Sequence, residues 1–316
     1  MNLNNQYLNL IKLILKEGEL VKSRNSDVLQ YFGPNNLVVE NVSKAFPILQ
    51  IRKLPFYKSV LETCFFLSGE TSFESMPEVL RNSWWKPWAA EAKAKNSWGQ
   101  FYSHQWRHQL TEPGYPEFDA FNHLIGECCD VIYDVVINRG MVVSLWNKPS
   151  FTEGYTSDKA VLQSCHGTAM TFNLVPDKTK PNAWHLDLHH YQRSLDVMCG
   201  TNADLVYSGL LMQIIADEVS NCLYDVNELE SSPVVSPRKL VYSLGNAHIY
   251  ASHMTGAYEL LKTCKSESYE AYPQPTVTSN SPLDFKSIRS VTDAKLAFQL
   301  NNYIATPGNY CFELIG

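Results

Sequence analysis

The stretch that decides the fold runs from Trp184 to Val219 and reads WHLDLHHYQRSLDVMCGTNADLVYSGLLMQIIADEV. Its first part, Trp184–Tyr191, combines apolar and aromatic side chains in a way that predicts a β-strand. Residues 205–219 are apolar nearly all round, which predicts a helix that is buried on all sides. The polar segment between the two, Gln192–Asp204, contains an arginine, a serine and two aspartates. A strand and a buried helix therefore flank a segment that is rich in functional groups.

Helices and strands are mixed irregularly along the rest of the chain. Apolar spacing predicts helices over residues 4–17, which would end at Gly18, over 57–68 and over 116–137. Further strands are predicted over Leu37–Val42, Met141–Trp146, Ala169–Val175 and Lys239–Ser243. Surface loops are predicted over 149–160, 176–183 and 226–238. Without a regular βαβ repeat, the pattern indicates the α+β class, as a single domain over residues 1–316 with a mixed or antiparallel buried sheet packed with helices.

Composition narrows the class of protein. The chain has 316 residues, 45% of them hydrophobic, and this is enough for a sizeable core. A net charge of −6 disfavours binding to nucleic acid polymers, which needs a basic surface, whereas a mononucleotide needs only a few arginines. No apolar stretch is long enough for a membrane span, and the N-terminus does not resemble a secretory signal. The eight cysteines show no zinc spacing, so we expect reduced thiols, no metal site and a cytoplasmic protein.

Cys165 differs from the other cysteines because polar residues surround it and His166 follows directly. A thiolate nucleophile needs a nearby cation or hydrogen-bond donors. Arg193 is the candidate cation, and its planar guanidinium group also suits a phosphate. Asp204 follows eleven residues after this arginine and can read the edge of a nucleobase. A thiol, an Arg-Ser pair and a carboxylate in this order suggest a site for a pyrimidine nucleotide.

Seven short motifs are spread across most of the chain. They are Phe46–Thr71, which includes Glu62, then Trp84–Trp88, Phe101–Arg107, Val142–Asn147, Cys165-His166, Tyr191–Val197 and Gly245–His253. The motifs and their order resemble those of the thymidylate synthase family, and the site pattern is closest to the family's phage deoxycytidylate 5-hydroxymethyltransferases. Seven matches in the family's order make chance agreement implausible.

The resemblance implies a covalent mechanism. Cys165 would add to carbon 6 of the pyrimidine, and 5,10-methylenetetrahydrofolate would then donate a one-carbon unit to carbon 5. Glu62 would move protons through water, Tyr102 would assist proton removal from carbon 5, and His166 belongs to the nucleophile motif. The apolar surroundings of Glu62 agree, because burial raises the pKa of a carboxyl group. The pattern of the residues alone is equally compatible with an ordinary glutamate on an exposed helix face.

The resemblance also implies how the nucleotide and the cofactor bind. The nucleotide-binding set would be Arg24, Arg139, Gln192, Arg193, Ser194, Asp204, His248 and Tyr250. The folate-binding set would be Arg52, Trp85, Trp88 and Asp196. Family arginines ahead of the Val142 strand reach the phosphate of the neighbouring subunit, which implies a homodimer with shared sites. The chain has one arginine here, Arg139, where the family commonly has two, and isolated arginines of this kind are otherwise typical of the protein surface.

Asp204 decides the expected base. Counted without gaps from Arg193-Ser194, it occupies the place of the asparagine that reads uracil in thymidylate synthases. A carboxyl group can accept from the exocyclic amine of cytosine and, when protonated, donate to its ring nitrogen. Facing uracil, an ionised carboxylate would set acceptor against acceptor. The aspartate therefore favours deoxycytidylate, although a two-residue slip would put Asn202 in the site and restore uracil.

Three functions stay open from the sequence. The first is a deoxycytidylate 5-hydroxymethyltransferase, which would act in DNA modification in the host cytoplasm if a phage encodes the chain. The second is a methyltransferase on deoxycytidylate or deoxyuridylate. The third is a catalytically silent homologue that binds a nucleotide or an RNA.

Overall fold

The central feature of the fold is a six-stranded mixed sheet with the strand order β1-β2-β6-β5-β4-β3. The computed structural model describes residues 2–23, 26–111, 114–134, 136–226, 233–264, 272–306 and 312. The strands are β1 (Glu19–Lys22), β2 (Asp27–Val39), β3 (Val142–Val143), β4 (Ala169–Pro176), β5 (Ala183–Asp196) and β6 (Val234–Tyr250). Only the β5–β6 pair is parallel among these strands, and the other neighbours are antiparallel.

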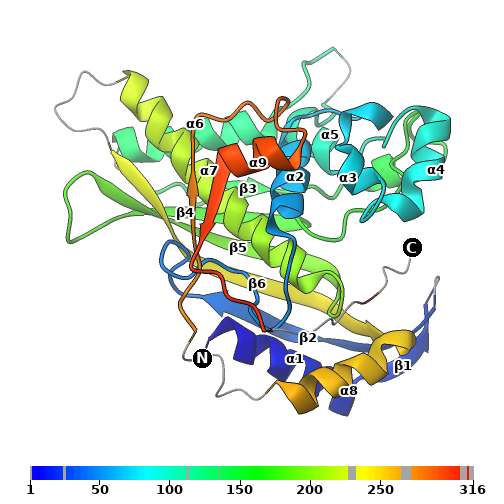
Figure 1. Cartoon of the computed structure of the whole chain (residues 1–316). Helices are drawn as coiled ribbons and strands as arrows, with labels where there is room; N and C mark the ends of the chain where they lie inside the picture. The colour runs from blue at the N-terminus through cyan, green and yellow to red at the C-terminus, as the bar shows by residue number, and fades with distance from the viewer. Residues whose placement is uncertain are drawn as a thin grey trace.

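The parallel pair is joined by a long crossover helix, α7 (Thr201–Val226). This helix lies across the sheet in Figure 1 and is almost wholly apolar where it packs on β5 and β6. Gly209 lets α7 pack closely against the segment Phe46-Pro47, because a Cβ atom at this position would lie 2.5 Å from the Pro47 side chain. The carboxyl ends of two parallel strands meet at one edge of a sheet, so β5, β6 and the start of α7 converge there.

The two faces of the sheet have different surroundings. One cross-strand row is buried and consists of Leu37, Tyr242, His190, Met170 and Val143. The adjacent row, which points to the opposite face, is exposed or half-buried and consists of Val38, Val241, His189, Thr171 and Val142. Alternate side chains of a strand point to opposite faces, so the core lies on one side of the sheet only.

The remaining helices pack on the sheet, on α7 or on one another. They are α1 (Leu3–Glu17), α2 (Phe56–Leu67), α3 (Glu78–Arg81), α4 (Lys86–Lys95), α5 (Tyr102–Arg107), α6 (Ala120–Asp134), α8 (Met254–Thr263) and α9 (Val291–Ala297). Short 3₁₀ turns occupy Phe73–Ser75, Lys148–Phe151 and Ala251–His253, and β7 (Thr276–Ser279) pairs with β8 (Phe298–Asn301). The buried apolar side chains form one continuous cluster. The predicted α+β fold with a mixed buried sheet is confirmed.

Most predicted elements are confirmed, with different limits. Helices predicted over 4–17, 57–68 and 205–219 correspond to α1, α2 and α7, and Gly18 caps α1. The helix predicted over 116–137 was too long, since α6 spans Ala120–Asp134. Strands predicted over Ala169–Val175 and Trp184–Tyr191 are β4 and β5, whereas only Val142–Val143 of the strand predicted over Met141–Trp146 forms.

One strand prediction and one loop prediction erred beside prolines. Only Leu37–Val39 of the strand predicted over Leu37–Val42 forms, as the end of β2, which starts at Asp27 and has a register shift at Gly33-Pro34. The loop predicted over 226–238 was wrong from Val234 onward, because β6 begins there, while residues 227–232 lie outside the described residues. Pro237 lies beside a second register shift, between Leu186 and Leu188, where a residue without a backbone N–H is tolerated.

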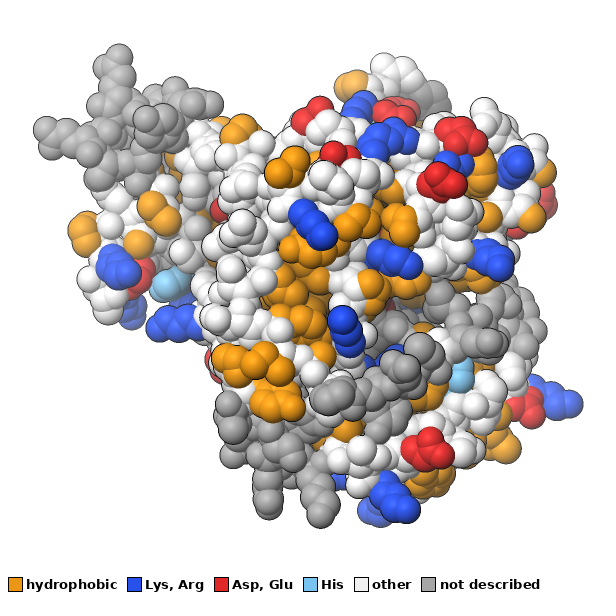
Figure 2. Space-filling view, viewed as in Figure 1, with side chains coloured by type: hydrophobic (Ala, Val, Ile, Leu, Met, Phe, Trp, Pro, Cys, Tyr) orange, Lys and Arg blue, Asp and Glu red, His pale blue; other side chains and the backbone are white. Residues whose placement is uncertain are grey.

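The surface in the view of Figure 2 has scattered charges. Lys and Arg side chains lie singly among Asp, Glu and apolar side chains on this face, rather than in a continuous stripe. Among the described residues, no helix is both long enough and apolar enough to cross a membrane.

Candidate active site

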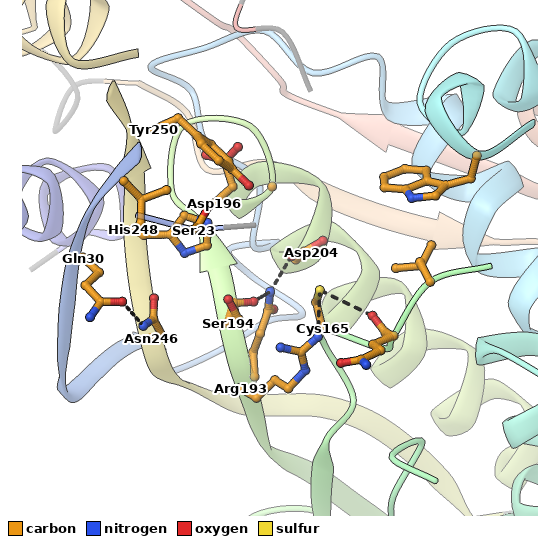
Figure 3. Close-up of a pocket in the computed structure, with 16 residues that line it drawn as sticks. Ser23, Gln30, Cys165, Arg193, Ser194, Asp196, Asp204, Asn246, His248 and Tyr250 are labelled. Carbon is orange, nitrogen blue, oxygen red and sulfur yellow. Dashed lines mark hydrogen bonds between the residues drawn. The ribbon is translucent and has the colours of Figure 1, made fainter. Parts of the chain in front are cut away.

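A pocket of about 630 Å³ opens at the carboxyl ends of β5 and β6. Its volume is within the range of about 300–1,000 Å³ that small-molecule sites have. The parallel register sets Ser194 beside Asn246 and Asp196 beside His248, so both strands present polar side chains at this edge (Figure 3). The antiparallel β2 adds Gln30, whose strand partner is His248. The pocket is therefore built by strands that are far apart in the sequence.

The candidate nucleophile lies on a tight turn between the 3₁₀ turn Lys148–Phe151 and β4. The Cys165 backbone N–H donates to the Tyr102 hydroxyl oxygen at 2.7 Å, and the Gly167 N–H donates to His190 Nε2 at 2.7 Å. Gly167 has a φ of +66°, and a Cβ atom there would lie 2.6 Å from Leu145. Only glycine suits both this conformation and this contact, so the position of Cys165 is tightly determined.

Arg193 brings a positive charge to the thiol. Its Nη2 atom lies 3.6 Å from Cys165 Sγ (Figure 3), while its Nε donates to the Ser164 carbonyl oxygen at 2.7 Å. The guanidinium group also lies over the Trp146 ring, 5.0 Å from its centroid. A fixed cation at this distance stabilises a thiolate. The expected pairing of Cys165 with Arg193 is therefore present in the geometry.

His166 lies behind the thiol rather than in the pocket. Its ring stacks on Tyr102 with centroids 4.2 Å apart and planes 3° apart. Burial lowers the pKa of His166 to about 3, so the ring is neutral at physiological pH. Its Nδ1 atom has no hydrogen-bond partner within the described part of the chain. The ring therefore supports the nucleophile turn by packing.

Asp204 and Asn202 lie on the first turn of α7 but have different environments. Asp204 lines the pocket, and its Oδ2 accepts a hydrogen bond of 2.9 Å from Gln192 Nε2. Burial raises the pKa of Asp204 to about 7, against the effect of the Gln192 bond. The Asn202 side chain instead accepts from the Leu49 N–H at 2.8 Å and donates to the Arg52 carbonyl oxygen at 3.1 Å. The ungapped register therefore agrees with the pocket, and Asn202 holds the chain ahead of α2.

Glu62 lies on α2 with one strong hydrogen bond. The Trp85 indole N–H donates to its Oε1 at 2.6 Å. Burial raises the pKa of Glu62 to about 8, and the charge of the nearby Asp204 adds to the shift. The side chain is half-buried, so the alternative interpretation, an ordinary glutamate on an exposed helix face, is wrong. A carboxyl group with this pKa can release and recover protons near neutral pH.

The residues expected to bind folate are divided between the pocket and its surroundings. Trp88 and Asp196 line the pocket, whereas Trp85 is buried behind Trp88, with ring centroids 5.7 Å apart. Arg52 is not at the pocket wall; its guanidinium group donates to the Met198 carbonyl oxygen and lies 4.6 Å from the centroid of Phe312. Asp196 Oδ1 accepts from the backbone N–H groups of Met198 and Cys199.

Nine of the residues singled out from the sequence meet at the pocket. They are Trp88, Cys165, Gln192, Arg193, Ser194, Asp196, Asp204, His248 and Tyr250. Glu62, Tyr102 and His166 support it from behind through the contacts given above. Arg139 is exposed and outside the pocket, and Arg24 lies outside the described residues.

Several polar residues of the site were not predicted. Asn246 Nδ2 donates to Gln30 Oε1 at 2.7 Å across two strands, and both residues line the pocket. The hydroxyl of Tyr242 donates to Gln192 Oε1. Asn246 shares a strand face with His248, since the two residues are two positions apart, and this spacing could have revealed it. Tyr242 and Gln30 had no comparable signal.

One group near the pocket could bind a metal ion. Ligand atoms of Asp196, Cys199 and His253 lie within 4.8 Å of one another. The positive charge of Arg52 acts on Cys199, and burial raises the pKa of this thiol. A cation and a neutral thiol both disfavour metal binding, and the expected lack of a metal stays a prediction.

Comparisons with known proteins agree with the geometry. The family model described as thymidylate synthase matches residues 5–309. A thymidylate synthase of Mesoplasma florum is 27% identical over 285 residues, with 81% of this chain and 85% of the relative covered. The thymidylate synthase of Saccharomyces cerevisiae is 25% identical over 316 residues, with coverage of 96% and 94%, and that of Enterobacteria phage T4 is 26% identical over 321 residues, with coverage of 96% for both chains. The chain therefore belongs to the thymidylate synthase family, whose members are folate-dependent pyrimidine nucleotide methyltransferases that use 5,10-methylenetetrahydrofolate as the one-carbon donor.

Proposed function

We propose that the chain is a deoxycytidylate 5-hydroxymethyltransferase whose catalytic domain spans residues 1–316. The observation that carries this choice is the placement of Asp204 in the pocket, with the amide of Asn202 bound elsewhere. Thymidylate-forming members of the family need a partner for uracil, and an ionised carboxylate is a poor one because it sets an acceptor against oxygen 4. Cytosine presents an amine and a bare ring nitrogen, which a carboxyl group can satisfy together.

The hydrogen bonds of Asp204 support the proposal that it recognises cytosine. Gln192 Nε2 donates to Asp204 Oδ2 and to the Ser194 carbonyl oxygen, so both of its hydrogens are used. Asp204 Oδ2 is therefore an acceptor, and a proton on the acid belongs on Oδ1. With its pKa raised to about 7, the acid can hold that proton near neutral pH and donate it to the ring nitrogen of cytosine.

The positions of the other groups support the roles that the family resemblance implies. Cys165, held beside the charge of Arg193, adds to carbon 6 of the base. Glu62 keeps a proton at neutral pH and passes it between the base and water. Tyr102, in contact with the Cys165 N–H, assists removal of the proton from carbon 5. Ser194 and Arg193 hold the phosphate, and His248 and Tyr250 bind the sugar hydroxyl.

The pocket fits a reduced folate beside the nucleotide. Trp88 offers an aromatic surface for a flat heterocycle, and Asp196 offers a carboxylate to its amino and ring N–H groups. When bound, 5,10-methylenetetrahydrofolate supplies the one-carbon unit and, for a methyl product, also a hydride. Trp85 positions Glu62, and Arg52 supports the wall through Met198.

A homodimer with shared sites is part of the proposal. The outer face of the sheet exposes a row that includes Val142 and Thr171, and Tyr191 is also exposed there. A second copy of the chain would cover this face. Arg139, close to the edge strand β3, does not reach the pocket of its own subunit, which suits a residue that contacts the phosphate in the partner's site.

A thymidylate synthase-type methyltransferase is the second candidate. It is favoured by the names of the relatives, all three of which are thymidylate synthases. The two products differ in whether water or hydride reaches the methylene carbon on the base.

The test is incubation of the protein with 5,10-methylenetetrahydrofolate and either deoxycytidylate or deoxyuridylate. We expect turnover of deoxycytidylate, a product heavier by one CH₂O unit and no dihydrofolate. Dihydrofolate appears only when hydride is transferred, so its formation would support the methyltransferase. Turnover of deoxyuridylate alone would contradict the role of Asp204, and no turnover of either nucleotide would favour a silent homologue.

A further inference from the structure

A fully buried histidine that has no part in the proposed chemistry lies between the two key elements of the pocket. His190 is in the buried row of the sheet, on β5, and none of its surface is exposed. Its neighbours in this row are Met170 and Tyr242. An imidazole in such a place must have partners for both nitrogens, because unpaired buried polar groups are costly.

Both ring nitrogens of His190 are engaged, and their roles are fixed. Nε2 lies 2.7 Å from the Gly167 backbone nitrogen, which can only donate, so Nε2 carries no hydrogen. The hydrogen of the neutral ring is therefore on Nδ1, which donates to Ser208 Oγ at 2.8 Å. Burial lowers the pKa of His190 well below its usual value, in agreement with a neutral ring.

The chain of hydrogen bonds continues to the base-reading residue. Ser208 Oγ donates to the Asp204 carbonyl oxygen at 2.9 Å, one turn earlier in α7. The donor and the acceptor of each hydrogen bond are thus known along the path from Gly167 through His190 and Ser208 to Asp204. At one end is the turn of the nucleophile, and at the other end is the first turn of α7.

We propose that His190 is a positioning residue that holds the Cys165 turn at a fixed distance from Asp204, so that both meet one pyrimidine ring. The pyrimidine ring of the nucleotide is rigid: its carbon 6 faces the Cys165 thiol, and its opposite edge faces the Asp204 carboxyl group. A shift of either element would lose one of the two contacts. The inference rests on the proposed roles of Cys165 and Asp204.

Two substitutions separate the two hydrogen bonds of His190. A glutamine amide reaches the place of imidazole Nε2, so His190→Gln keeps an acceptor for Gly167 and loses the link to Ser208. An asparagine amide lies near the place of Nδ1, so His190→Asn keeps the link to Ser208 and leaves the Gly167 N–H unpaired. Ser208→Ala removes only the second link, and His185→Gln, at the far end of β5, is the matched control.

The first measurement is the rate of Cys165 alkylation by iodoacetamide, followed on its own peptide by mass spectrometry without any substrate. The alkylation rate should change about tenfold in His190→Asn, because one buried donor is left unpaired. It should change by no more than about twofold in His190→Gln and in Ser208→Ala. The second measurement is the ratio of kcat/KM for the two nucleotides. This ratio should fall about tenfold in His190→Gln and Ser208→Ala and stay unchanged in His190→Asn.

The outcomes distinguish this inference from the proposed function. Equal losses in His190→Gln and His190→Asn on both measurements, in proportion to their loss of thermal stability, would mean that His190 only fills the core. If the protein turns over neither nucleotide, the alkylation measurement still tests the link between His190 and Cys165.

Discussion

The middle of α2 and the first turn of α7 each bring a carboxyl group to the pocket region, and the two groups are held differently. Glu62 on α2 has one hydrogen bond, from the Trp85 indole, and burial raises its pKa to about 8. Asp204 on α7 is bound by Gln192, whose own amide is oriented by Tyr242, and its pKa is raised to about 7. Similar burial therefore gives one acid that can exchange protons and one whose orientation is fixed.

The difference shows how hydrogen bonds divide roles between groups of one chemical type. A carboxyl group with a free oxygen can pass its proton to water, as general acid–base catalysis requires. A carboxyl group held in a network presents a constant pattern of donor and acceptor, as recognition requires. We expect substitutions to separate catalysis at Glu62 from discrimination at Asp204.

Glu62→Gln should have the largest effect. Glutamine can still accept from the Trp85 indole but cannot exchange a proton, so kcat should fall by about 10²–10⁴-fold with little change in nucleotide affinity. Steady-state kinetics and calorimetric binding of the nucleotide measure the two quantities. Trp85→Phe, which removes the indole N–H together with part of the buried ring, is the control and should lower kcat by a smaller factor. A kcat within about threefold of that of the unmodified protein would contradict the catalytic role.

Asp204→Asn should change specificity more than rate. When the Gln192 amide turns over with it, an amide at this position presents a donor to oxygen 4 and an acceptor to the ring N–H of uracil, so the ratio of kcat/KM should shift toward deoxyuridylate by about 10²-fold or more. Asn202→Asp is the matched control two residues away: a carboxylate still accepts from the Leu49 N–H but faces the Arg52 carbonyl oxygen as a second acceptor, so the change should lower stability and leave the ratio unchanged. The opposite result for the pair would place base recognition at Asn202.

The pH dependence of stability should differ between the two acids. Burial raises the pKa of Glu62 from 4.5 to about 8, so the folded state binds more protons than the unfolded state between these values. The free energy of unfolding therefore falls as the pH rises through this window. Glu62→Gln should remove a fall in the free energy of unfolding on the order of 3 kcal/mol between pH 5 and pH 8.

Asp204→Asn should remove a similar dependence that begins near pH 3.8 and ends near pH 7. Urea denaturation at a series of pH values measures both windows. Parallel curves for the substituted and unmodified proteins would mean that the acids are not shifted in the fold.

Tyr242→Phe should have the smallest effect. Without the Tyr242 hydroxyl, the Gln192 amide can turn over and present its oxygen to Asp204, so discrimination between the nucleotides should weaken by roughly threefold to tenfold. Tyr207→Phe is a suitable control, since the Tyr207 hydroxyl accepts from Trp106 instead. If Tyr242→Phe changed kcat for both nucleotides equally, Gln192 would not act through Asp204.

The fold was predictable where the sequence pattern was continuous. The apolar runs of β5 and α7 identified the core of the sheet and its covering helix. Pro237 and Gly33-Pro34 interrupt the patterns of β6 and β2, so the sequence indicated loops or shorter strands there. These residues remain in strands because register shifts accommodate them, and such shifts depend on the neighbouring strand.

The pocket was predictable where motifs were specific. The run Gln192–Asp196 and the His248 motif led to residues that line it. His190 and Tyr242 gave no signal, because buried polar side chains on a strand have no periodic mark, and their partners lie on other elements. Only the packing of α7 on β5 and β6 brings these partners together.

The sequence by itself determined the family, the mixed α+β class and a short list of reactive groups, because these depend on residue types and their order. It left open which of two side chains, Asn202 or Asp204, would meet the base. The tertiary structure decided their environments. Residues two apart on a helix point about 200° away from each other, so one side chain faces the pocket and the other faces the chain before α2. Which is which depends on how α7 is rotated against the sheet, and the packing of its buried side chains fixes that rotation.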